Sequence, residues 1–116
     1  MFKNFSNNEN QKLWDTYYNK QLTGLEGSEK DKKKTSINQY KPILLIADEA
    51  INKSFSEIKI NEYKQVEELA INKNRLNHLN GFLVEMVNEK QLTLDKNVLT
   101  MLVPNQYRNI IKILLD

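Results

Sequence analysis

Apolar residues recur at helical spacing along most of this chain. Residues 9–22 place large side chains three to five positions apart, on one stripe of a predicted helix: Leu13, Trp14, Tyr17, Tyr18 and Leu22. A second helix is predicted after Thr35 or Ser36, either of which suits an N-cap, and its stripe is Ile37, Tyr40, Leu44, Ala47 and Ile51. Pro42 indicates that this second helix either starts near Lys41 or bends there.

The second half of the chain shows the same periodicity. We expect a short helix from an Asn61 cap to Ala70 and a longer helix over residues 74–90. Asp95 suits the cap of a short helix ending at Leu102, and Pro104 suits the first turn of a last helix ending at Leu115. The pattern of alternation that is typical of strands does not persist. The predicted fold is therefore all-α, a compact bundle of four to five short helices with an extra N-terminal helix.

Two segments interrupt the pattern. Residues 1–8 are polar apart from Phe2 and Phe5, and we expect them to fray. Residues 26–34 contain no apolar residue and are typical of a solvated linker. We therefore divide the chain into an N-terminal helix with a basic linker, residues 1–34, and a helical core domain, residues 35–116.

Length and composition suit one globular core. The chain has 116 residues, of which 40% are hydrophobic and 28% are charged, close to the average for globular domains. The longest apolar run, residues 43–47, is far shorter than the roughly 20 residues that cross a bilayer, and the first residues do not resemble a signal peptide. We expect a cytoplasmic protein without a membrane segment.

The residue inventory argues against catalysis. The chain has no cysteine and one histidine, and it contains neither a glycine-rich phosphate loop nor a nucleophile motif. The adjacent pairs Asp48–Glu49 and Glu67–Glu68 are interpreted as solvated helix faces, because neighbours in a helix point about 100° apart. We expect no enzyme, no metal site and no cofactor.

The basic residues are more informative for their distribution than for their number. The net charge is only +2, which by itself does not indicate a nucleic-acid partner. Lys30, Lys32, Lys33 and Lys34, however, directly precede the second predicted helix, where a basic arm could follow a phosphate backbone. The start of the long helix gathers donors with no acid before Glu85, and the residues are Asn72, Lys73, Asn74, Arg75, Asn77 and His78.

Trp14, Tyr17 and Tyr18 allow three interpretations. A helical stripe of aromatic residues is usually packing, but it also suits a partner-facing surface or a platform on which bases stack. We favour packing. Whether this helix docks on the core or mediates self-association stays open.

From Thr35 onward the chain resembles the N-terminal core-binding domain of phage-type tyrosine recombinases and integrases. The resemblance covers roughly residues 35–92: the opening Thr35-Ser-Ile-Asn-Gln-Tyr40, the segment Phe55-Ser-Glu-Ile-Lys-Ile60-Asn-Glu-Tyr63, and Asn74-Arg-Leu-Asn-His-Leu-Asn-Gly-Phe82-Leu83. It implies a SAM-like fold of four to five helices that clamps duplex DNA. The extra helix before Gly24 departs from that pattern, and the catalytic residues of the family have no counterpart in this sequence.

Carried over by position, the resemblance implies contacts to DNA from two patches that overlap the basic segments above. The first patch is Thr35, Ser36, Gln39 and Lys41, to which the charge pattern adds Lys32, Lys33 and Lys34. The second patch is Lys73, Asn74, Arg75, Asn77 and His78. The chain is then either a separated N-terminal domain or a non-catalytic regulator that binds duplex DNA. The alternative is a small phage or plasmid protein that binds or inhibits another protein, or forms a homo-oligomer, through the Trp14 helix.

Overall fold

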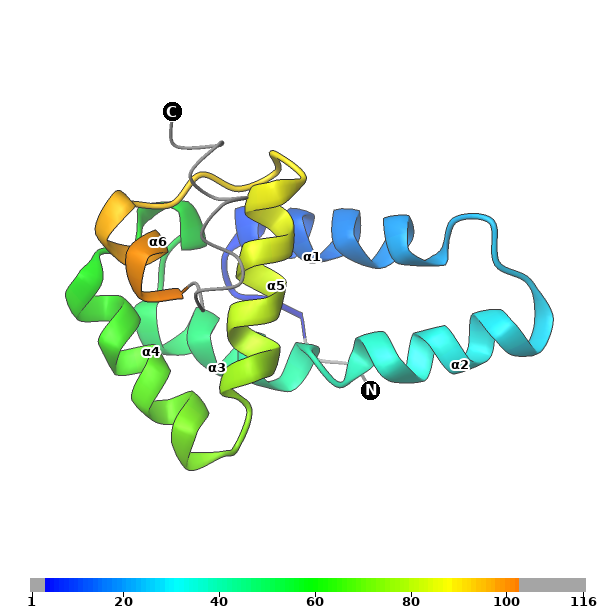
Figure 1. The fold of residues 1–116 in the computed structure, drawn as a ribbon, viewed down its shortest axis with the longest axis horizontal. Helices are drawn as coiled ribbons and strands as arrows, with labels where there is room; N and C mark the ends of the chain where they lie inside the picture. Colours follow the sequence, from blue (N-terminus) through cyan, green and yellow to red (C-terminus); the bar gives the residue numbers. More distant parts are fainter. Residues whose placement is uncertain (1–3, 103–116) are drawn as a thin grey trace.

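The computed structural model describes residues 4–102, and these residues fold into α-helices joined by short turns. The described part of the chain contains no β-strand, so the predicted all-α class is confirmed. Figure 1 shows the elements in chain order, which are α1 (Asn8–Leu22), α2 (Gly27–Asn38), α3 (Lys41–Ile51), the 3-10 turn η1 (Phe55–Glu57), α4 (Ile60–Asn72), α5 (Leu76–Asn88) and α6 (Lys96–Leu102).

Helix α1 is fixed by a side-chain cap and by its aromatic stripe. The Asn7 side-chain oxygen accepts hydrogen bonds from the backbone N–H groups of Glu9 (2.9 Å) and Asn10 (3.1 Å), which satisfies two donors that the helix leaves free. Trp14 is 3% exposed and Tyr17 is 8% exposed. The interpretation of this stripe as packing is therefore confirmed.

Helix α2 corrects the predicted linker. Residues 27–34 are helical, and α2 continues to Asn38. Its inner face is made by Lys30 and Lys34, which are half-buried, and by Ile37, which is 2% exposed. These positions follow the i, i+4, i+7 spacing of one helix face, and long lysine side chains can bury their aliphatic stems while the ammonium group stays in water. A segment without apolar residues thus still has a face to pack.

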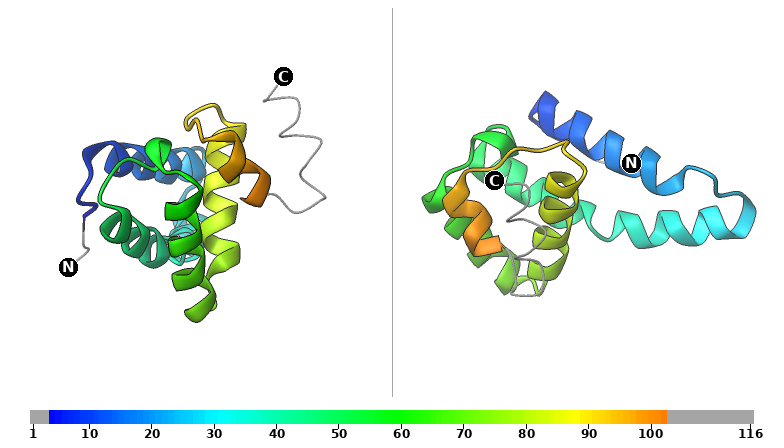
Figure 2. Two further views of the ribbon diagram at one scale, coloured as in Figure 1. Left: turned by 90° about the vertical axis from the view of Figure 1, so that its left-hand side faces the viewer. Right: turned by 45° about the horizontal axis from the view of Figure 1, so that its top comes forward.

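The α1–α2 hairpin projects from the remainder of the molecule. Figures 1 and 2 show the end of α1 and most of α2 extending to one side, which agrees with overall extents of 41 × 31 × 26 Å. Gly24 (φ 82°) and Gly27 (φ 61°) have left-handed backbone conformations in the connection, where a side chain would be strained. The domain boundary predicted after residue 34 falls inside α2.

The predicted second helix is divided between α2 and α3. Thr35 and Ser36 are not N-caps but lie in the last turn of α2, where the Thr35 hydroxyl donates to the backbone carbonyl of Asp31 at 3.2 Å. Helix α3 begins at Lys41 with Pro42 in its first turn, a position at which the missing N–H of proline costs nothing. Of the two alternatives drawn from Pro42, the start near Lys41 is confirmed.

Helices α4 to α6 match their predicted positions with corrected ends. Helix α4 starts one residue before the expected Asn61 cap, and the Glu62 carboxylate accepts a hydrogen bond from the Lys59 backbone N–H at 2.8 Å. Asp95 does cap α6, because its carboxylate accepts from the Asn97 N–H at 2.9 Å. The last predicted helix, residues 104–115, lies outside the described residues.

A buried polar network attaches the N-terminal segment to the helices. The Asp48 carboxylate, 1% exposed, accepts hydrogen bonds from the backbone N–H of Ser6 (2.7 Å) and of Asn7 (3.2 Å) and from the Asn10 side-chain amide (2.9 Å). The interpretation of Asp48 and Glu49 as a solvated helix face is therefore wrong for Asp48. Phe5, 6% exposed, packs beside this network, so the expectation that residues 1–8 fray is wrong for residues 5–7.

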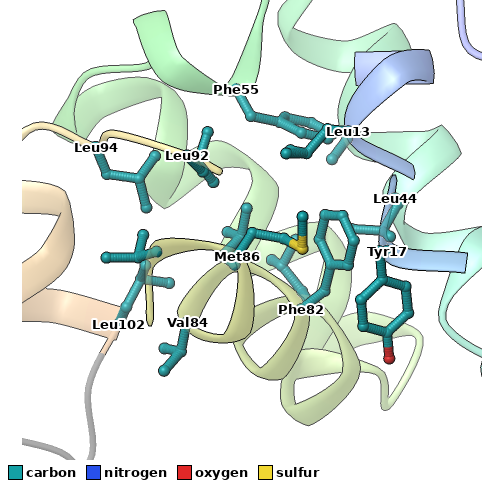
Figure 3. Packing of buried hydrophobic residues seen from close by; sticks show 14 of the residues in the cluster. Leu13, Tyr17, Leu44, Phe55, Phe82, Val84, Met86, Leu92, Leu94 and Leu102 are labelled. Atoms are coloured by element: carbon teal, nitrogen blue, oxygen red, sulfur yellow. The ribbon is translucent and has the colours of Figure 1, made fainter. Parts of the chain in front are cut away.

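The core is organised around α5. In Figure 3, Phe82 and Met86 of α5 point toward Tyr17 of α1 and Leu44 of α3, and Leu92, Leu94 and Leu102 pack at the other end. The ring of Phe82 meets that of Tyr17 edge to face, with the centroids 5.0 Å apart, an arrangement that aromatic pairs favour. Within residues 4–102, no helix is both long and apolar enough to cross a membrane.

Candidate nucleic-acid interface

The turn between α4 and α5 carries the more strongly basic of the two predicted patches. Helix α4 ends in a Schellman motif, in which the Arg75 N–H donates to the Ala70 carbonyl (2.8 Å) and the Asn74 N–H donates to the Ile71 carbonyl (3.0 Å). Asn74 has a φ of 57°, in the left-handed region that asparagine tolerates better than most residues. The backbone of this turn is therefore held rigidly.

This geometry changes how the second patch is presented. The sequence placed Lys73, Asn74 and Arg75 on the face of one long helix, whereas Lys73 and Asn74 form the turn and Arg75 is the residue before α5. Asn77 and His78 lie in the first turn of α5. The patch is thus a corner followed by a helix start: Lys73, Asn74 and Arg75 are presented by the corner, and Asn77 and His78 by the first turn of α5.

The corner is exposed and free of acidic residues. Lys73, Asn74, Arg75 and Asn77 are all exposed, and no Asp or Glu occurs between Glu68 and Glu85. The N-terminus of α5 also suits an anion: its N-cap residue, Arg75, has no acceptor with which to cap the first N–H groups, and the N-terminal end of a helix favours anions. Figure 1 shows this corner at the lower end of the molecule.

A ring contact joins the corner to the first patch. The rings of Tyr40, between α2 and α3, and His78 of α5 have centroids 4.8 Å apart. Tyr40 is flanked in sequence by Gln39, which is exposed, and Lys41, which is half-buried. The structure therefore brings the α2–α3 junction at Tyr40 against the first turn of α5.

Lys41 has a second environment. Its ammonium nitrogen lies 5.9 Å from the centroid of the Trp14 ring, within the range of a cation–π contact. It also lines a shallow hollow of about 230 Å³ together with Trp14, Tyr18 and Asn38. Lys41 thus serves packing on α1 as well as the surface.

The lysines of α2 form a separate surface on the projecting hairpin. Lys32 and Lys33 are exposed and line a shallow groove of about 580 Å³ between α1 and α2, together with Lys20, Ser36 and the acidic Glu29. Lys20 also pairs with Glu89, the residue that follows α5. Lys34 is half-buried, and the Thr35 hydroxyl donates to the Asp31 carbonyl within α2. The predicted basic arm is therefore a helix.

Two residues of the basic surfaces were missed by the sequence interpretation. Lys20 reaches the α2 lysines only because the hairpin folds back, which no local pattern indicates. Ile71, beside the corner, is 56% exposed. The sequence could have indicated its exposure, because the three consecutive apolar residues Leu69, Ala70 and Ile71 cannot all lie on one buried helix stripe.

The three side chains with a shifted pKa, Tyr17, Glu62 and Tyr63, lie outside residues 73–78 and take part in packing or hydrogen bonds within the fold. Burial raises the pKa of Tyr17 to about 12, with the neighbouring Tyr40 and Glu85 adding to the effect. Burial also raises the pKa of Tyr63, and hydrogen bonds from Lys53 and from the Lys59 backbone lower the pKa of Glu62. Among residues 4–102, no group of three or more His, Asp or Glu side chains is arranged to hold a metal ion.

Comparison with known proteins gives no match: no family model fits this sequence, no curated protein is similar to it, and no solved structure matches its fold. The basic corner (residues 73–78) and the hairpin surface (Lys20, Lys32 and Lys33) are therefore interpreted from their own residues.

Proposed function

We propose that this chain is a helical DNA-binding module whose main contact surface is the basic corner, defined as residues 73–78. One observation carries the proposal: Lys73 and Arg75 are exposed on a rigid turn, with no acidic residue between Glu68 and Glu85. A polyanion is attracted to such a concentration of donors even when the net charge of the chain is small.

The roles within the corner follow from side-chain chemistry. Lys73 is a point charge suited to a phosphate oxygen, and the free N–H groups at the start of α5 suit a neighbouring phosphate. Arg75 offers two parallel donors that match the acceptors of guanine in the major groove, and the Asn77 amide matches adenine. His78 is packed on Tyr40 and positions the helix start.

The hairpin surface extends the footprint. Lys32 and Lys33 supply further positive charge on the projecting α1–α2 hairpin, whereas Lys20 in the same groove is paired with Glu89. In Figure 1, α2 and the basic corner both lie on the lower side of the molecule. We assign Lys32 and Lys33 to phosphate contacts that add affinity without sequence preference.

The resemblance to the core-binding domain of tyrosine recombinases supports the same partner, duplex DNA. Under this proposal the chain is a separated N-terminal domain or a non-catalytic regulator with a SAM-like helical core, acting in the cytoplasm and without cofactors. The alternative, protein binding through the Trp14 helix, receives no support from the structure, because Trp14 and Tyr17 are buried and Tyr18 is half-buried.

The proposal is tested by fluorescence anisotropy with a labelled random-sequence duplex of about 20 base pairs at low salt. We expect saturable binding that the Lys73→Ala/Arg75→Ala variant weakens by tenfold or more, from about 1 kcal/mol or more per contact. Lys96→Ala, an exposed lysine on α6 that is distant in sequence from the corner, is the matched control and should bind like the parent. Equal loss in both variants, or no binding by the parent, would contradict the proposal.

A further inference from the structure

Ile71 is an exposed apolar side chain with no role in the core. It is 56% exposed, whereas the other large hydrophobic residues within 4–102 are buried or half-buried. The preceding residue, Ala70, is 0% exposed and faces the core, so the two neighbours point in different directions around α4. Burial on folding therefore does not explain a branched apolar residue at this position.

The backbone at Ile71 is held by the same turn as the basic corner. Its carbonyl accepts the hydrogen bond from the Asn74 N–H at 3.0 Å, within the Schellman motif that ends α4. Ile71 is also stiff at χ1, because it is β-branched in a helix. The side chain thus has a defined position next to the basic corner, two residues before Lys73 and four before Arg75.

The surrounding charge indicates what covers this side chain. A second copy docked on this face by two-fold symmetry would bring two sets of Lys73 and Arg75 into one interface, and like charges repel. A partner must instead combine negative charge with an apolar group at the contact. Glu68, one helical turn before Ile71, is exposed and limits the basic surface on that side, so the partner lies toward Lys73.

Duplex DNA combines these two properties. Phosphates line the groove, and the C5 methyl group of thymine is the apolar group that the major groove presents to a protein. We propose that Ile71 contacts a thymine methyl group while Lys73 and Arg75 contact the adjoining backbone and bases. This inference rests on the proposed function and adds a preference for thymine-containing sites.

The test uses two duplexes of identical sequence, one with thymine and one with deoxyuridine at every thymine position. These probes differ only in the methyl group. Burying one methyl-sized group contributes about 0.8 kcal/mol, so we expect the parent to bind the thymine duplex about fourfold more tightly. Ile71→Ser should bind both duplexes equally, with the affinity that the parent shows for the uracil duplex. Ile71→Val should keep most of the discrimination.

The outcomes separate the inference from the proposed function. Lys73→Ala should weaken binding to both duplexes by the same factor and keep the fourfold ratio, because it removes a phosphate contact. If the parent binds both duplexes equally well, the thymine contact is wrong while DNA binding stands. Retention of the ratio in Ile71→Ser would also overturn the contact. If neither duplex binds at low salt, the proposed function itself fails.

Discussion

The rings of Tyr40 and His78 lie with their centroids 4.8 Å apart at an interplanar angle of 60°. Tyr40 stands between α2 and α3, and His78 lies in the first turn of α5, so this contact fixes the basic corner relative to the first predicted patch. The Tyr40 ring also meets that of Tyr17, 6.1 Å away, which links the same junction to α1. Aromatic packing of Tyr40 on His78 and Tyr17 therefore connects the candidate interface to α1 and to the α2–α3 junction.

The contact between Tyr40 and His78 should be measurable as a coupling energy. In a double-mutant cycle with Tyr40→Leu and His78→Ala, we expect the free energy of unfolding to show about 0.5–1.5 kcal/mol of interaction, the range for such ring pairs. Urea denaturation followed by circular dichroism gives the four values. Additive losses would mean that the two rings do not stabilise each other.

The Asp48 carboxylate should be one of the most sensitive positions in the fold. Asp48→Ala leaves three hydrogen-bond donors without an acceptor, and we expect it to lower the free energy of unfolding by about 3 kcal/mol. Glu68→Ala, at an exposed carboxylate, is the control and should change it by less than about 0.5 kcal/mol. Similar small effects of both changes in urea denaturation would contradict the structural role given to Asp48.

The buried tyrosines predict a loss of stability at alkaline pH. The pKa of Tyr17 is raised to about 12 in the folded chain, above the value of about 10 in an unfolded chain. The folded state therefore holds the phenol proton more tightly, and this contribution is complete below pH 10 and lost as the pH rises from about 10 to 12. Tyr17→Phe should make the thermal midpoint fall less steeply across this pH window. Part of the fall should remain, because burial raises the pKa of Tyr63 as well. An unchanged decline would argue against burial of the Tyr17 hydroxyl.

Helical periodicity predicted most of the fold because amphipathic stripes are local. The stripes on residues 9–22 and 74–90 correspond to α1 and α5, and the packing role of Trp14 followed from its spacing. Pro42 correctly marked the start of α3. These features depend on neighbours within two turns of helix, which a sequence displays directly.

Features that depend on contacts between distant segments were not predictable in this way. Helix α2 has almost no apolar surface: Ile37 is its one buried residue, and Lys30 and Lys34 on the same face are half-buried, which depends on the segments that α2 meets in the fold. Asp48 appeared solvated because its partners, residues 6, 7 and 10, are about 40 positions away in sequence. The basic residues were found from their types alone, but their arrangement as a corner depends on the left-handed backbone at Asn74.

The salt dependence of binding to random duplex DNA tests the central claim most directly. Each phosphate neutralised by a lysine or arginine changes the slope of log K against log salt concentration by about −0.9. We predict a clearly negative slope for the parent and a slope shallower by up to about 2 for Lys73→Ala/Arg75→Ala, since two cationic contacts are removed. A parent that does not bind at low salt, or a double variant with the parental slope and affinity, would contradict the assignment of the basic corner as a DNA-binding surface.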